Sequence, residues 1–207
     1  MHPVQIIEPT VVKKVFDSTE INCIVVEVDG NEYDACVNAS IGKNFWGNSK
    51  PGAYGAGLGS TTVDKFKTAR TGLLGQMAFA KIFNQPVDLE YRKGGDKFDN
   101  KIGKRTFDIK CAMRGDSGRN LIQYINERGQ INQQALSKDI YILSYIESED
   151  RMRKKCKIVI VGFATKKDIQ ECETQIAEAG HSNYVVRFSK SRSIVTLLEL
   201  KRKEYGN

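Results

Sequence analysis

Residues that bind soft metals or form disulfides are scarce in this sequence. The 207 residues include two histidines and five cysteines, an odd number, and no Cys-x-x-Cys pair. A zinc site and a disulfide framework are therefore not expected. We expect five reduced thiols, which favours a cytoplasmic compartment.

Long apolar runs are also missing. A membrane helix needs about 20 consecutive apolar residues, and no stretch of the chain approaches that length. The opening residues, MHPVQIIEP, lack the basic and apolar regions of a secretory signal. We therefore expect neither a membrane partner nor secretion.

What is present is a globular composition with excess positive charge. A hydrophobic share of 40%, a charged share of 28% and only four prolines exclude collagen-like, mucin-like and wholly disordered chains. The length suits one domain over residues 1–207, comprising an N-terminal segment (1–60), a core (61–165) and a C-terminal segment (166–207). Thirty-two Lys and Arg against 25 Asp and Glu give a net charge of +7, which favours nucleic acid as a partner.

The hydrophobic patterns predict an α/β fold with one mixed central sheet flanked by helices. A β-hairpin around Asp29-Gly30 is expected over 20–37 as an N-terminal extension, followed by a Gly-rich loop over 42–60. Helices are predicted over 61–83 and 166–180. Strands are predicted over 87–92, 97–102, 105–113, 139–146, 157–163, 184–188 and 194–200, whereas 121–125 is ambiguous.

The most informative segment is GGDKFDNKIGKRTFDIK, residues 94–110. If Gly103 and Lys104 form a two-residue hairpin turn, Asp99 faces Asp108 across the two strands. Lys110 then projects from the same face as Asp108, because side chains alternate along a strand.

Two opposed carboxylates repel each other unless one is protonated or a cation bridges them. Carboxylate oxygens in this arrangement suit Mg²⁺, which also binds water and substrate phosphate. A lysine on the same face can orient the attacking water or stabilise charge that develops on a phosphate. These parts are sufficient to hydrolyse a phosphodiester.

At these positions the chain resembles the restriction-endonuclease-like, or PD-(D/E)xK, nuclease superfamily. Asp108-Ile109-Lys110 matches the acid-x-Lys motif, Asp99 matches the preceding Asp, and residues 71–81 resemble the first core helix. The resemblance implies a restriction-endonuclease-like core and a Mg²⁺-dependent endonuclease acting on DNA, with Mn²⁺ able to substitute. It assigns Asp99, Asp108 and the backbone carbonyl of Ile109 to the metal, and Lys110 to the attacking water.

The chain departs from the family pattern in its first core helix. Where the family often has Glu, this sequence has Gln76. An amide oxygen is a poorer ligand for a hard cation than a carboxylate and cannot act as a base. Gln76 could still position a water or ligate a metal weakly. The alternatives are a slower enzyme, a second acid such as Glu90 or Asp96 that serves instead, a degenerate site, or an ordinary polar position on a helix.

Several basic and aromatic residues are candidate nucleic-acid contacts. The Gly-rich segment supplies Lys43, Trp46 and Lys50, of which the aromatic ring could stack on a base. Arg114 follows the acid-x-Lys strand, and Arg153 and Lys154 lie in a basic run between two predicted strands.

The sequence thus predicts a metal-dependent nuclease acting on DNA rather than RNA, and a homodimer would supply two sites for two strands. A nuclease-like fold that binds nucleic acid without cutting it is the alternative. A basic protein-interaction domain remains open if the hairpin assignment fails.

Overall fold

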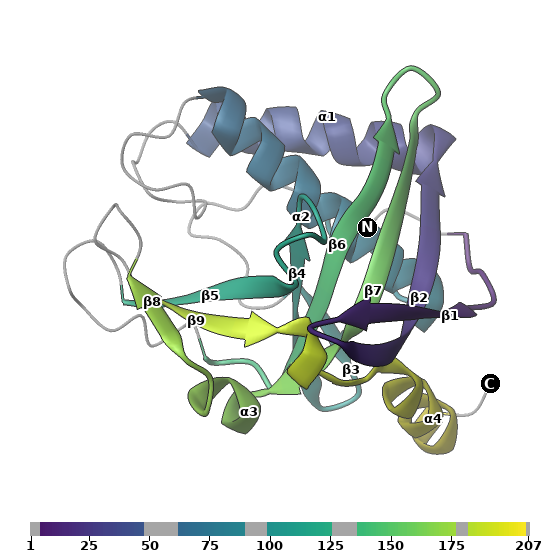
Figure 1. Ribbon diagram of the computed structural model, residues 1–207. Helices are drawn as coiled ribbons and strands as arrows, with labels where there is room; N and C mark the ends of the chain where they lie inside the picture. The colour runs from purple at the N-terminus through teal and green to yellow at the C-terminus, as the bar shows by residue number, and fades with distance from the viewer. Residues whose placement is uncertain (1–4, 48–61, 90–98, 126–135, 177–181, 206–207) are drawn as a thin grey trace.

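The computed structural model describes residues 5–47, 62–89, 99–125, 136–176 and 182–205 (Figure 1). The helices are α1 (Gly30–Gly47), α2 (Thr62–Phe83), α3 (Lys166–Gln170) and α4 (Ile194–Tyr205), with a 3-10 turn η1 (Phe188–Lys190). The strands are β1 (Thr10–Phe16), β2 (Thr19–Asp29), β3 (Asn100–Ile102), β4 (Arg105–Ala112), β5 (Arg119–Ile125), β6 (Ile140–Asp150), β7 (Lys155–Thr165), β8 (Thr174–Ile176), β9 (Ser182–Arg187) and β10 (Arg192–Ser193).

The main sheet is mixed, as predicted. Its strand order is β1-β2-β7-β6-β4-β3, and the short β10 also pairs with β7. Strands β4 and β6 run parallel, and the other neighbours run antiparallel. Strands β5, β9 and β8 form a separate small sheet. The coarse prediction, an α/β fold with a mixed central sheet and flanking helices, is confirmed.

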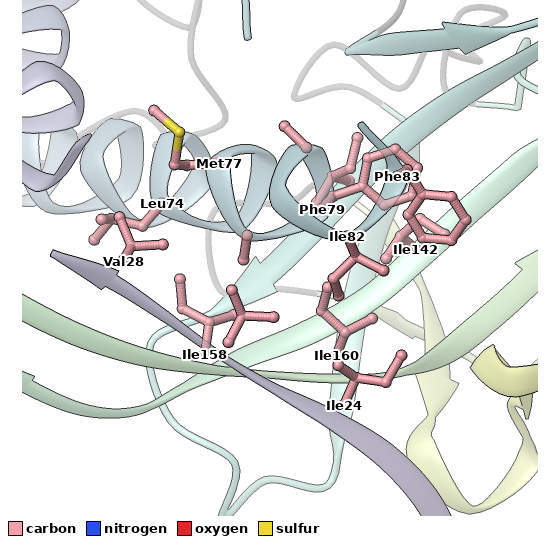
Figure 2. Packing of buried hydrophobic residues seen from close by; sticks show 14 of the residues in the cluster. Ile24, Val28, Leu74, Met77, Phe79, Ile82, Phe83, Ile142, Ile158 and Ile160 are labelled. Carbon is pink, nitrogen blue, oxygen red and sulfur yellow. The ribbon is translucent and has the colours of Figure 1, made fainter. Parts of the chain in front are cut away.

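Helix α2 lies across one face of the main sheet and forms the larger core with it. Figure 2 shows Leu74, Met77 and Phe79 of this helix above isoleucines and a valine from β2, β6 and β7. Each large apolar side chain buried in this way stabilises the fold by about 1.5–3 kcal/mol. Helices α1 and α4 extend the same core through their own buried residues.

The opposite face of the sheet carries a second core. Alternation along β6 sends Ile140 and Ile142 to the helix side, and Tyr141 and Leu143 to the other side. The small sheet and turn η1 cover that second side; Phe188 of the turn stacks on Tyr145 with ring centroids 5.7 Å apart.

The N-terminal hairpin differs from its prediction. It consists of β1 and β2, with Asp17 and Ser18 as turn residues at φ of 47° and 63°, and β2 pairs with β7 inside the main sheet. Gly30 begins helix α1, so the predicted strand over 32–37 is wrong. Tyr33 and Cys36, three residues apart, are both buried, which is a helical and not an alternating pattern.

Two C-terminal predictions are also wrong. Thr165 and Asp168 do form a capping box, but helix α3 ends at Gln170 rather than at 180, and residues 174–176 form strand β8. The segment 194–200 is helical, with Ile194, Leu197 and Leu198 buried at spacings of three and four. Its β-branched start had favoured a strand.

The other elements agree more closely with the patterns. The ambiguous segment 121–125 belongs to β5, and the strands predicted over 139–146 and 157–163 are longer, as β6 and β7. Residues 42–47 of the predicted loop end helix α1, whereas 48–60 lie outside the described residues. Val87 makes an isolated bridge, and residues 90–92 of that predicted strand also lie outside.

Helices α1 and α2 are joined by a buried ion pair. The Lys81 ammonium lies 2.5 Å from Glu32 Oε2, with side-chain exposures of 4% and 11%. Glu32 also accepts a hydrogen bond from the Gln5 backbone N–H. Among the described helices, none has both the length and the apolar character needed to cross a membrane.

Candidate active site

The site begins where strand β3 stops pairing with β4. The predicted turn at Gly103 is present, with φ of 58°, and the ladder runs from Ile102–Arg105 to Asn100–Phe107. It ends one pair short of the predicted Asp99–Asp108 pair. Beyond Phe107, the described residues provide no strand on this side of β4.

Asp99 occupies this open edge. Its backbone N–H donates to the Phe107 carbonyl at 3.0 Å. Its side chain turns back, so that Oδ2 accepts a hydrogen bond from the Ile109 N–H at 2.6 Å. The carboxylate therefore replaces the carbonyl that a longer β3 would have offered to β4.

Helix α2 supplies the second partner of Asp99. Gln76 Nε2 donates to Asp99 Oδ1 at 2.9 Å. The helix lies unusually close to the strand here, because a Cβ at Gly75 would stand only 2.7 Å from Cys111 Cβ. Gly75 thus permits the approach that brings the Gln76 amide to the edge of the sheet.

Asp108 and Lys110 project from β4 on the face opposite Phe107 and Ile109, as strand alternation requires. Lys110 Nζ lies 3.0 Å from Asp108 Oδ2, with side-chain exposures of 34% and 17%. This ammonium and carboxylate are thus partly buried and already paired.

The Asp108 carboxylate is close enough to Asp99 to change the protonation of Asp99. The pKa of Asp99 is raised to about 7, chiefly by burial and next by the Asp108 carboxylate, through its charge and a side-chain hydrogen bond. Lys110 and the Ile109 N–H oppose the rise. Burial lowers the pKa of Lys110, but the two carboxylates outweigh it, so its pKa is raised and it stays protonated.

The backbone of Ile109 contributes to the same edge. In an extended strand, the N–H and C=O of one residue point to the same side. Since the Ile109 N–H meets Asp99, its carbonyl also faces the open edge rather than β6. Two carboxylates and this carbonyl are the hard oxygen ligands that Mg²⁺ prefers.

The fit to a metal is incomplete in one respect. Among the described residues, no group of three or more His, Cys, Asp or Glu side chains gathers around a possible ion. Gln76, where the resemblance leads one to expect an acid, directs its amide nitrogen toward Asp99. The predicted second acids, Glu90 and Asp96, lie outside the described residues.

Sequence reasoning missed two buried polar residues behind the site. Ser144 Oγ donates to the Lys110 carbonyl at 2.9 Å, and Asn120 Nδ2 donates to the Ser144 carbonyl at 3.3 Å. Both side chains are buried, and together they fix the backbone that carries Lys110. The available signal was one Ser within the otherwise apolar run IYILSYI.

The three predicted nucleic-acid contacts whose side chains the structure describes, Arg114, Arg153 and Lys154, are not gathered at this edge. Arg114 is exposed two residues after β4 ends, whereas Arg153 and Lys154 lie in the turn between β6 and β7. Lys154 pairs with Asp34 at 2.6 Å. Lys43 and Trp46 belong to helix α1 but their side chains are outside the description, as is the whole of Lys50.

Comparisons of this chain with protein-family models, with curated proteins and with solved structures find no match.

Proposed function

We propose that this protein is a divalent-metal-dependent nuclease that hydrolyses phosphodiester bonds in DNA, built on a restriction-endonuclease-like core. One observation carries the proposal. Asp99 and Asp108 approach each other at an open strand edge beside Lys110, and their mutual repulsion helps to raise the pKa of Asp99 to about 7. A hard cation bound there would stabilise both carboxylates in their charged form.

The chain's own residues divide the work of hydrolysis as follows. Asp99, Asp108 and the Ile109 carbonyl would hold Mg²⁺, or Mn²⁺ in its place, and the ion would polarise the scissile phosphate and its attacking water. Lys110 stays protonated, so it stabilises charge on the phosphate or orients the water rather than acting as a base. Gln76 positions the Asp99 carboxylate through its amide hydrogen bond.

A second function is favoured by Gln76 itself. A neutral amide in place of a third acid weakens the site for a hard cation. The ion pair with Lys110 also neutralises the Asp108 carboxylate, so this carboxylate does not need a metal ion to balance its charge. These features favour a nuclease-like fold that binds nucleic acid without cutting it.

Supercoiled plasmid incubated with the pure protein and Mg²⁺ or Mn²⁺ separates the two functions. We expect nicking that requires metal and is lost in Asp108→Asn and Lys110→Ala. Glu20→Gln, a change of an exposed acid on β2, is the control and should cut normally. Binding without cutting in either metal would support the binding module, and cutting by Asp108→Asn would refute the assigned site.

A further inference from the structure

A groove opens where strand β4 ends, between the first half of α2 and the second half of β6. Its volume is about 690 Å³, and its walls include Thr71 from the helix and Met113 from the segment after β4. Gly115 and Tyr145 also line it. The backbone of Gly115 lies against the Tyr145 ring, because a Cβ there would stand 2.5 Å from a ring carbon.

Helix α2 and the chain of β4 lead from the candidate active site to the groove. Met113 follows Lys110 by three residues, which is about 10 Å in a strand. Thr71 precedes Gln76 by five residues, which is about 7.5 Å along a helix. Met113 follows Ile109 by four residues and Asp108 by five, so along the strand the groove starts about 13–17 Å from the candidate metal ligands of β4. That distance is about four to five nucleotide steps, at a rise of about 3.4 Å per step.

Most acids in the groove are already paired. Glu149 lies 2.9 Å from Arg70 Nη2 and 3.4 Å from Arg151 Nε. Glu147 pairs with Lys14 from β1. The negative charges of these two β6 carboxylates are therefore neutralised within the protein.

The remaining charges favour an anionic ligand. Lys67 and Arg114 make no ion pair with any residue that the structure describes. Asp116 is the one acid of the groove lining that likewise has no ion pair among the described residues. Arg70 Nε and Thr71 Oγ1 are buried in the helix wall without a hydrogen-bond partner among the described residues. The groove thus has donors and positive charge in excess of its own acceptors.

We propose that this groove, which we call the Arg114 groove, holds the phosphodiester backbone of the DNA strand that continues from the candidate active site. Lys67 and Arg114 contact its phosphates from opposite walls. Asp116 opposes binding, since its carboxylate faces the same ligand. The proposal rests on the proposed function for the identity of the ligand, but it concerns binding and does not require cutting.

The test measures binding of a fluorescent duplex in EDTA at several salt concentrations, so that no cutting occurs. Each phosphate contact contributes about 0.9 to the slope of log K against log salt. The double variant Lys67→Ala/Arg114→Ala should reduce that slope by about 1.8, whereas Asp116→Asn should tighten binding. The matched control is Lys104→Ala, because Lys104 is an exposed cation at the other end of β4 and should leave the slope unchanged.

The outcomes separate the groove from the chemistry. Equal slopes for the wild type and the double variant would refute DNA binding in the groove. An equal reduction of the slope in Lys104→Ala, or a wild type that does not bind the duplex, would refute it as well. The same proteins are then assayed for plasmid nicking with Mg²⁺. Binding that depends on the groove, without nicking, would refute the proposed nuclease activity but support DNA binding in the groove. Nicking with no change of slope in the double variant would support the nuclease activity but refute DNA binding in the groove.

Discussion

Two glycines on helix α2 offer a matched test of how the site is assembled. A Cβ at Gly75 would stand 2.7 Å from Cys111 Cβ, whereas a Cβ at Gly72 meets nothing within 4 Å among the described residues. Both lie in the interior of the same helix, where Gly is less favourable than Ala by about 1 kcal/mol. The two substitutions to Ala therefore differ mainly in the contact with β4.

The sizes of the two effects, helix propensity and overpacking, determine whether each substitution raises or lowers the stability of the protein. Gly72→Ala should stabilise the protein by about 1 kcal/mol. In Gly75→Ala the same gain is opposed by overpacking, which costs about 1–3 kcal/mol, so the net change is about zero to 2 kcal/mol of destabilisation. For a chain of this length, each kcal/mol corresponds to about 2–4 °C in melting temperature.

Thermal and urea unfolding of the metal-free protein would measure these changes, and Gly75→Ala/Cys111→Gly would identify the cause. Removing Cys111 Cβ vacates the space that the new methyl group needs, so the double variant should be more stable than the sum of the single changes predicts. If Gly75→Ala stabilised the protein as much as Gly72→Ala, the close approach of α2 to β4 would not constrain the site.

Three further predictions concern buried charge. The pKa of Asp99 is raised to about 7 in the fold from its ordinary 3.8, so the metal-free protein should lose stability as pH rises from about 4 to above 7. The loss should be at most about 1.4 kcal/mol per pH unit, and unfolding at several pH values would measure it. Gln76→Glu should destabilise the metal-free protein by about 1–3 kcal/mol, because it replaces a donor to Asp99 with a carboxylate, and should enlarge the rise in melting temperature on adding Mg²⁺. Lys81→Met should cost about 3–5 kcal/mol in urea unfolding, because it leaves Glu32 buried without its cation.

Each of these has its own control. Asp99→Asn should flatten the pH dependence, and an unchanged profile would mean that another group causes it. An equal Mg²⁺ shift in Gln76→Glu and the wild type would show that residue 76 is remote from any ion. Lys81→Met/Glu32→Leu should recover most of the lost stability, and failure to recover would indicate that lost packing, not stranded charge, is responsible.

The sequence was most informative where a pattern had one physical interpretation. The turn at Gly103-Lys104 was predicted correctly, and side-chain alternation along the following strand gave the proximity of Asp108 and Lys110. The position of Asp99 was predicted less well, because its ladder partner was inferred from register alone. The structure ends that register at Asn100 and directs the carboxylate to a backbone N–H.

Short segments with mixed signals were misassigned. Residues 32–37 follow the turn-like Asp29-Gly30 pair, and residues 194–200 begin with three β-branched residues, so both segments suited strands. Their buried positions, however, recur at spacings of three and four. Packing against α2 and the sheet determines their conformation, and local propensity carries no information about that packing. Ser144 stands out as the one polar residue of its apolar run, but only the fold places Ser144 and Asn120 behind Lys110.

The edge of β4 beyond Phe107, which no strand of the described residues covers, carries a consequence for self-association. A strand with unpaired backbone groups is a template for another chain, and natural proteins commonly block such edges with charge. Asp99 caps one backbone N–H there and sets a carboxylate in the path of any incoming strand. The residue proposed to bind a metal therefore also keeps neighbouring molecules from adding to the sheet, so its replacement by an apolar side chain would be expected to promote aggregation even if the fold survived.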